Sequence, residues 1–173
     1  MIGMPQGLKQ SSSVVSIGFS VEEKSANTFQ QESIDLNLSP LDREVFVVLA
    51  VNLDGSFPDA IDGTNTLFSG SLTTTSQTDI SDLSNSNCLS VLQTAIRAGG
   101  FAEGGVPFTS QALETPPSTL EYIGIIATND FFVQCKGVNN LAAKGINGKM
   151  YGYRAVASAD IYAALVQSEV LSA

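Results

Sequence analysis

Residues Glu44 to Leu53 read EVFVVLAVNL, and this run decides the fold class. Apolar residues fill almost every position, and most of them are β-branched or aromatic, which favours a strand over a helix. A strand without polar alternation must be covered on both of its faces. We therefore expect this segment to lie centrally in a packed sheet.

Further strands are predicted on both sides of this run. In Val15–Val21, apolar residues alternate with serine and glycine, the period-two pattern of a half-buried strand. Ser33–Leu38 and Lys149–Val156 predict strands in the same way, and Thr66–Ser76, rich in serine and threonine, predicts an exposed strand.

A hairpin is predicted in the second half of the chain. Leu120–Thr128 reads LEYIGIIAT and is followed by Asn129-Asp130 and then by the apolar run FFVQCK. Asparagine and aspartate tolerate positive φ, so this pair predicts a tight turn between two antiparallel strands.

Two short helices are expected, at about 85–98 and 159–171. In the first, Cys88, Val91, Leu92, Ala95 and Ile96 recur at intervals of three and four. In the second, Ser158 is placed to cap the helix and Asp160 lies in the first turn. The apolar side of the second helix would consist of Ile161, Ala164, Leu165 and Val166.

This inventory predicts a mainly β fold: an antiparallel β-sandwich or jelly-roll-like barrel whose two helices cover an edge or an end. We expect a single β-rich domain over residues 13–173, with a long Gly- and Pro-containing loop at about 99–118. Residues 1–12 are expected to form an N-terminal arm that contacts a neighbouring subunit.

The composition excludes several classes of function. The chain has 173 residues and no histidine, which removes Ser-His-Asp and Cys-His catalysis and histidine metal sites. Only 14% of the residues are charged, while Ser, Thr, Asn and Gln make up 52 of the 173. Such a surface suits burial against other subunits, because interface cores are depleted in charge. We therefore expect a homo-oligomer without enzymatic activity or cofactor.

The net charge of −9 is concentrated in the first half, where residues 1–90 carry 11 acids and 3 bases. An acidic chain repels nucleic acid and anionic membranes, so we expect neither as a direct partner. Lys136, Lys144, Lys149 and Arg154 fall in a stretch without acids. These residues are either separate exposed bases or subunit-interface residues that meet the acidic half of a neighbouring copy.

Three aspartates are candidate calcium ligands: Asp54, Asp59 and Asp62, in the loop Asp54–Asn65. The loop does not fit an EF-type site, because Ala50 and Ile61 stand where oxygen donors are required. Turn formation is the alternative role for these aspartates.

Two tyrosines on one strand face, Tyr151 and Tyr153, are candidates for a platform that stacks against a sugar. The alternative is ordinary packing across strands. Cys88 and Cys135 lack a metal-ligand spacing and are expected to be two buried thiols or one bridge. The N-terminus lacks the pattern of a signal peptide, and no run is long enough to span a membrane.

The segment Glu121 to Val156 combines the apolar hairpin, an Asn/Gly/Ala-rich loop and the strand Tyr-Gly-Tyr-Arg. It resembles virion structural proteins of viruses that infect prokaryotes. The resemblance implies a β-sandwich or jelly-roll-like coat, decoration or minor capsid protein, made in the host cytoplasm and located in the virion. Its partners would be further copies of itself and other capsid proteins. The alternative function is a carbohydrate-binding or tail-fibre-type β-sandwich module that uses Tyr151 and Tyr153.

Overall fold

The computed structural model describes residues 6–98, 108–113 and 120–171. The described residues form ten strands and one helix: β1 (Leu8–Gln10), β2 (Val15–Glu22), β3 (Gln30–Asp35), β4 (Glu44–Gly55), β5 (Thr66–Thr73), β6 (Cys88–Arg97), β7 (Phe108–Leu113), β8 (Gly124–Ile126), β9 (Asp130–Val138), β10 (Gly145–Ala157) and α1 (Ala159–Leu171). The expectation of a mainly β chain is confirmed.

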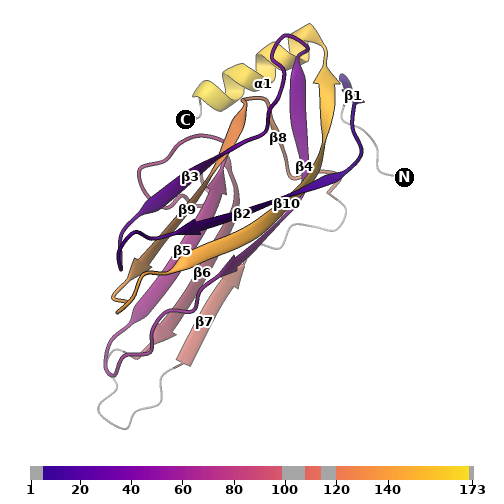
Figure 1. Ribbon diagram of the computed structural model, residues 1–173. Coiled ribbons are helices and arrows are strands. Elements are labelled where there is room, and N and C mark those ends of the chain that lie inside the picture. Colours follow the sequence, from indigo (N-terminus) through magenta and orange to yellow (C-terminus); the bar gives the residue numbers. More distant parts are fainter. Residues whose placement is uncertain (1–5, 99–107, 114–119, 172–173) are drawn as a thin grey trace.

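The strands form two five-stranded antiparallel sheets (Figure 1). In the first, sheet A, the order is β1-β10-β4-β8, and β2 also pairs with β10. In the second, sheet B, the order is β3-β9-β5-β6-β7. β1 and β2 follow each other within sheet A, and β5, β6 and β7 follow one another within sheet B. Every other connection between consecutive strands carries the chain from one sheet to the other.

The strand pairings are nested along the chain. β5 pairs with its neighbour β6, β4 pairs with β8, β3 with β9, and β2 with β10. The chain therefore folds back on itself as one long two-stranded ribbon, with β5 and β6 at its closed end. The ribbon is rolled up, and two additional pairings, β10 with β4 and β9 with β5, join its successive windings side by side into the two sheets.

A core between the two sheets holds the largest buried side chains. Phe46, Ile146 and Met150 come from sheet A, and Phe68, Phe131 and Leu72 come from sheet B. Gly70 of β5 is required by this packing, because a Cβ at Gly70 would lie 2.3 Å from Cδ1 of Ile146.

A second, smaller apolar cluster lies on the other face of sheet A, under α1. Val45, Val47 and Tyr153 contribute from the sheet, and Tyr162, Leu165 and Val166 pack against them from α1. Figure 1 shows α1 lying across the end of sheet A. This helix confirms the one predicted at 159–171, and Ser158 Oγ accepts a hydrogen bond from the N–H of Ile161, as a capping residue does.

The apolar run Glu44–Leu53 is covered on both faces over its first half, as expected. Phe46 and Val48 face the core between the sheets, whereas Val45 and Val47 face α1. A register irregularity lies opposite Tyr151/Gly152 of β10 and leaves Leu49 without a partner. One extra residue reverses the alternation. For this reason, Val51 and Leu53 pack against the same core as Phe46.

The helix predicted at 85–98 is wrong, because this segment is β6. Cys88, Ser90, Leu92 and Thr94 are buried in alternation, and two of these four residues are polar. A register irregularity beside Ser90 also turns Leu89 into the core. Because two of the buried residues carry hydroxyl groups and the bulge shifts the alternation, the period of two of a strand is not visible in the apolar residues. The apolar residues that remain recur at intervals of three and four, as they would in a helix.

The tight hairpin predicted at Asn129-Asp130 is also wrong. β8 belongs to sheet A and β9 to sheet B, so the chain crosses between sheets at this point. Asn129 accepts hydrogen bonds from the N–H groups of Leu36 and Leu38, through its backbone carbonyl and its side-chain Oδ1 respectively. The asparagine thus anchors a neighbouring segment instead of forming a two-residue turn.

The strand predicted at Thr66–Ser76 exists as β5, but it is not exposed. It lies between β9 and β6, and Thr66, Ser71 and Thr73 are buried. The hydroxyl of Ser71 donates to Oε1 of Gln134 at 2.6 Å, and Gln134 Nε2 donates to the hydroxyl of Thr73 at 2.8 Å. Ser71 and Thr73 are tolerated here because each forms a hydrogen bond with the buried side chain of Gln134.

The predicted loop at about 99–118 contains β7, which pairs with β6; residues 99–107 and 114–119 lie outside the described residues. Within the expected arm, β1 pairs with β10 of the same chain, and residues 1–5 lie outside the described part. Whether the arm reaches a neighbouring subunit stays a prediction. None of the described helices has the length and hydropathy needed to cross a membrane.

Candidate functional site: the interlocked loop end

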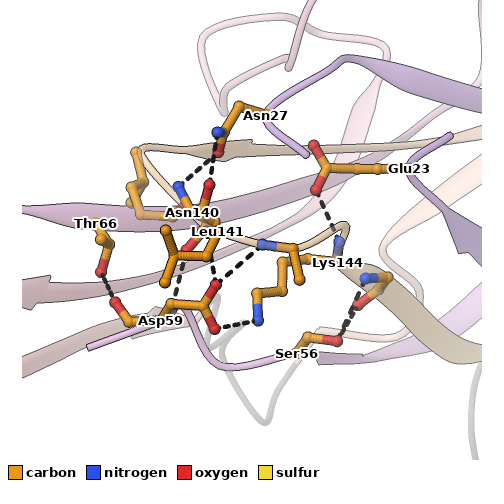
Figure 2. Close-up of polar contacts among 11 residues, drawn as sticks. Glu23, Asn27, Ser56, Asp59, Thr66, Asn140, Leu141 and Lys144 are labelled. Carbon is orange, nitrogen blue, oxygen red and sulfur yellow. Dashed lines mark hydrogen bonds and ion pairs between the residues drawn. The ribbon is translucent and has the colours of Figure 1, made fainter. Parts of the chain in front are cut away.

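Three connections that are distant in sequence meet at one end of the two sheets (Figure 2). They are the β2–β3 connection (residues 23–29), the β4–β5 connection (56–65) and the β9–β10 connection (139–144). We call this group the loop end. Polar side chains, not apolar ones, join the three connections.

Glu23 joins the first connection to the third. Its side chain is buried, and its two carboxylate oxygens accept three backbone N–H groups: Thr28 at 2.8 Å, Gly137 at 3.0 Å and Lys144 at 2.9 Å. A carboxylate that accepts several N–H bonds replaces the hydration it loses on burial. Glu23 therefore fixes the β2–β3 connection against both ends of the β9–β10 connection.

Asn27 and Asn140 form a reciprocal pair. The Nδ2 of Asn27 donates to the carbonyl of Asn140 at 2.9 Å, and the N–H of Asn140 donates to Oδ1 of Asn27 at 2.7 Å. The side chain of Asn140 then reaches the second connection, where its Oδ1 accepts the N–H of Asp59 and its Nδ2 donates to Leu67. Asn27 has φ of 63°, a left-handed conformation that asparagine adopts readily.

Asp59 and Lys144 form the charged part of the loop end. Lys144 Nζ lies 2.7 Å from Asp59 Oδ1, while Oδ2 accepts the N–H groups of Leu141 at 2.8 Å and Ala142 at 3.2 Å. The hydrogen bond from Lys144 is the main reason that the pKa of Asp59 lies below its usual value. Both carboxylate oxygens are thus engaged within the chain.

The calcium candidates occupy three different settings. Asp54 is exposed at the end of β4, Asp59 is engaged as above, and Asp62 is exposed in the β4–β5 connection. Among the described residues, no group of three or more acidic, cysteine or histidine side chains is arranged to hold a metal ion. The carboxylate of Asp59 joins the β4–β5 connection to the β9–β10 connection, a role that neither the calcium hypothesis nor local turn formation described.

Three of the four basic interface candidates form ion pairs within the chain. Lys144 pairs with Asp59, Lys136 lies 3.5 Å from Asp79, and Arg154 lies 3.8 Å from Glu44. Arg154 also donates to the carbonyl of Leu36 at 2.7 Å, so it joins sheet A to the segment after β3. Lys149 is exposed on β10 and has no ion pair within the described part of the chain.

The two tyrosines of the candidate platform differ in burial. Tyr153 is 5% exposed and belongs to the cluster under α1, where burial raises the pKa of its hydroxyl. Tyr151 is half-buried. A stacking surface that uses the face of Tyr153 is therefore not available, and Tyr151 is the tyrosine on this strand that retains exposed surface.

Both cysteines are buried, and no disulfide joins them. The Sγ of Cys135 lies in the core between the sheets, where burial is the main reason that its pKa is raised to about 12. A thiol with such a pKa is protonated at neutral pH and is a poor nucleophile.

Glu169 is a buried acid that the sequence reasoning did not single out. It is 6% exposed on the buried side of α1, and burial raises its pKa despite hydrogen bonds from Ala127 and Thr128. The sequence held a signal, since Glu169 follows Leu165 by four residues and so shares its helix face. The buried side of α1 is Tyr162, Leu165, Val166 and Glu169, whereas the predicted Ile161 and Ala164 are exposed.

Comparison with known proteins gives little further information. No family model matches the chain, and no curated protein matches it. Among solved structures, a chain from desmodium yellow mottle tymovirus is similar over 90% of this chain and 95% of that chain, with 15% identity and a TM-score of 0.28. A likeness at that TM-score carries no argument about fold or function.

Proposed function

We propose that this chain is a non-enzymatic virion structural protein with a jelly-roll fold, which self-associates in a viral capsid as a shell, decoration or minor capsid component. The single observation that carries the proposal is the nested strand pairing. A two-stranded ribbon that is rolled up so that its turns pair into two facing sheets is a jelly roll, the architecture of many viral capsid domains. The orders β2-β10-β4-β8 and β3-β9-β5-β6 correspond to such a rolled ribbon.

The use of polar side chains supports a structural role over a catalytic one. Glu23, Asp59 and Glu169 direct their carboxylates at backbone N–H groups. Glu23 and Asp59, whose carboxylate oxygens are all bonded within the chain, position loops and are not free to accept a proton from a substrate. The β2–β3, β4–β5 and β9–β10 connections are joined to each other by these hydrogen bonds.

The surface composition supports self-association. Serine, threonine, asparagine and glutamine are common among the exposed described residues, and the charged fraction of the chain is 14%. Many weak contacts between such surfaces suit a repeating assembly. We propose other copies of this chain and other capsid proteins as its partners, without direct contact with nucleic acid or membrane, and a location in the virion after synthesis in the host cytoplasm.

A second candidate function is a carbohydrate-binding or tail-fibre-type module, because jelly rolls also occur in lectins. The observation that favours it is a shallow pocket of about 260 Å³ on the exposed part of sheet A, lined by Asn52, Leu53, Asp54, Asn147, Gly148 and Lys149. Tyr151 lies on the same strand as three of these residues.

The mass of the purified protein in solution, measured by light scattering at low salt and at about 1 M salt, separates the two candidates. A closed oligomer or a large particle supports the virion proposal. A monomer under both conditions, together with binding on a glycan array that is lost on Tyr151→Ala, would replace the virion proposal with the carbohydrate-binding module.

A further inference from the structure

β2 is a long edge strand with one open side. It pairs with β10 over eight consecutive positions, from Val15 to Glu22, without a register irregularity. No other described strand pairs with β2 (Figure 1).

The backbone groups that point away from β10 can be identified from one hydrogen bond. The N–H of Glu23 donates to the carbonyl of Lys144 at 2.9 Å, in the same register as the β2–β10 pairing. Because hydrogen-bonded and non-hydrogen-bonded pairs alternate in an antiparallel ladder, the odd-numbered residues of β2 bond to β10. The N–H and C=O groups of Ser16, Gly18 and Ser20 therefore point to the open side.

This edge lacks the features that keep edge strands from pairing. Proteins protect such edges with lysine, proline, bulges or very short strands. β2 has eight residues, no proline and no lysine, and its one charged residue, Glu22, is at its end. The residues whose backbone groups are open carry small, exposed side chains.

No contact with the described residues explains the glycine at position 18. A Cβ at Gly18 would meet only the carbonyl oxygen of Gly148, at 4.0 Å, and the φ of Gly18 is not positive. Glycine weakens a strand interior and often marks the close approach of another backbone. Without a side chain at position 18, the exposed face between Lys149 and the open edge stays clear for side chains of another copy.

We propose that the open edge of β2 pairs with β2 of a second copy of this chain, so that sheet A continues across the interface. The inference rests on the proposed self-association and names its surface. A two-fold axis brings the same edge of two copies together in antiparallel orientation, and this makes the contact self-complementary. The two Glu22 side chains then lie at opposite ends of the paired strands and do not repel each other.

Charge complementarity favours a second copy as the occupant. Lys149 is the direct neighbour of Gly18 on the exposed face of sheet A, and it has no ion pair within the described residues. Two strand spacings, about 10 Å, separate β10 from the β2 of a second copy. If Gly18 faces Ser20 of the second copy, the pairing includes Ser16, Gly18 and Ser20, and Glu22 of that copy lies two residues, about 7 Å, further along its strand. An extended lysine and an extended glutamate span the resulting separation of about 12 Å, so Lys149 of one copy reaches Glu22 of the other past Gly18.

Backbone amide hydrogen exchange of the purified full chain tests the pairing, because only another copy can supply the partner. The amides of Ser16, Gly18 and Ser20 should exchange at least about tenfold more slowly in the assembled protein than at a dilution where it is monomeric. The amides of Ile17 and Phe19 are bonded to β10 in both states and serve as the reference within the same strand.

Proline substitution provides the matched variants. Gly18→Pro removes an N–H that points to the open side, and proline is tolerated at such edge positions. We expect a monomer with an unchanged circular dichroism spectrum and association at least about tenfold weaker than that of the wild type. Ser33→Pro is the control, because the hydrogen bond from the Leu36 N–H to Asn129 places the Ser33 N–H on the open edge of β3. Ser33→Pro should associate as the wild type does.

The outcomes separate this inference from the proposed function. Normal assembly of Gly18→Pro, with unprotected Ser16, Gly18 and Ser20 amides in the wild-type assembly, would overturn the β2 interface and leave self-association intact. A wild-type protein that stays monomeric at every concentration would overturn both. If Gly18→Pro fails to fold, Ser20→Lys, which places a charge on the same edge without altering the backbone, answers the same question.

Discussion

The carboxylate of Glu169, on the buried side of α1, accepts hydrogen bonds from both the backbone N–H and the hydroxyl of Thr128. Its Oε2 lies 3.2 Å from the Thr128 nitrogen and 2.7 Å from Oγ1, while Oε1 lies 2.6 Å from the nitrogen of Ala127. These two residues begin the crossover from β8 to β9, so one side chain fastens the C-terminal helix to the point where the chain changes sheets.

Glu169→Ala should lower the free energy of unfolding by about 2–3 kcal/mol, because it leaves buried donors of Ala127 and Thr128 without an acceptor. Urea denaturation followed by circular dichroism measures the change. Gln167→Ala, on the exposed side of the same helix, is the matched control and should change stability by less than about 0.5 kcal/mol. Equal stability of the two variants would show that the carboxylate does not hold the crossover.

The pH dependence of stability should carry a signature of the same carboxylate. The pKa of Glu169 is raised in the folded protein above the ordinary value of 4.5, mainly by burial. Between pH 4.5 and the folded pKa, the folded state therefore binds more protons at this group than the unfolded state does. The stabilisation from this group is complete below pH 4.5 and declines as pH rises through the folded pKa. The difference in unfolding free energy between the wild type and Glu169→Gln should accordingly fall as pH increases from 4.5. A difference that rises with pH would show that the pKa is lowered instead.

Substitution by alanine should lower the stability of the protein at the buried Gly70 but not at the exposed Gly18. Gly70→Ala places a methyl group against Ile146 in the core, and it should cost about 1–3 kcal/mol through overpacking. Gly18→Ala brings the new methyl group only to ordinary contact distance, 4.0 Å from the carbonyl oxygen of Gly148, and it should be neutral or slightly stabilising, because alanine restricts the unfolded chain more than glycine. Thermal unfolding of the two variants compares them directly. A large loss at Gly18 would mean that the exposed face of β2 at this position is covered within the monomer.

The sequence predicted those elements whose physical cause is local. β2 shows a clean period of two, α1 has a capping serine at its start, and the apolar run in β4 implied cover on both faces. The structure explains this last pattern with a core between the sheets on one face and α1 on the other. Each of these signals lies within a single segment of the chain.

The errors arose where a distant segment decides the structure. Ser90 and Thr94 are buried in β6, so their polarity concealed a strand. Asn129 serves as an acceptor for residues more than 90 positions away instead of forming a turn. The ion pair of Asp59 with Lys144 joins two loops whose residues are 85 positions apart, and no pattern within either loop predicts this pair.

Loss of Asp59 should loosen the loop end without unfolding the sheets. In Asp59→Ala, the N–H groups of Leu141 and Ala142 lose their acceptor and Lys144 loses its partner. Hydrogen exchange at these two amides should accelerate, whereas exchange at Val133 in β9 should stay at the wild-type rate. Unchanged exchange at Leu141 would mean that Glu23 and Asn140 suffice to hold the connection.

The proposed contact between copies predicts a charge reversal with rescue. Lys149→Glu should weaken association, and so should Glu22→Lys, because each replaces an attraction across the interface with repulsion. The double variant restores opposite charges and should recover association toward the wild-type level. Analytical ultracentrifugation of the four proteins measures this recovery, and additive losses in the double variant would show that the two residues do not meet.

The central claim is that this rolled ribbon of strands is the repeating unit of an assembly. Electron cryomicroscopy of the purified protein, concentrated until light scattering shows association, tests it most directly. The account predicts particles in which copies are related by symmetry, with sheet A continuous through β2 at a two-fold contact. A protein that remains monomeric at every concentration, or that associates without any symmetric arrangement of its copies, would contradict it.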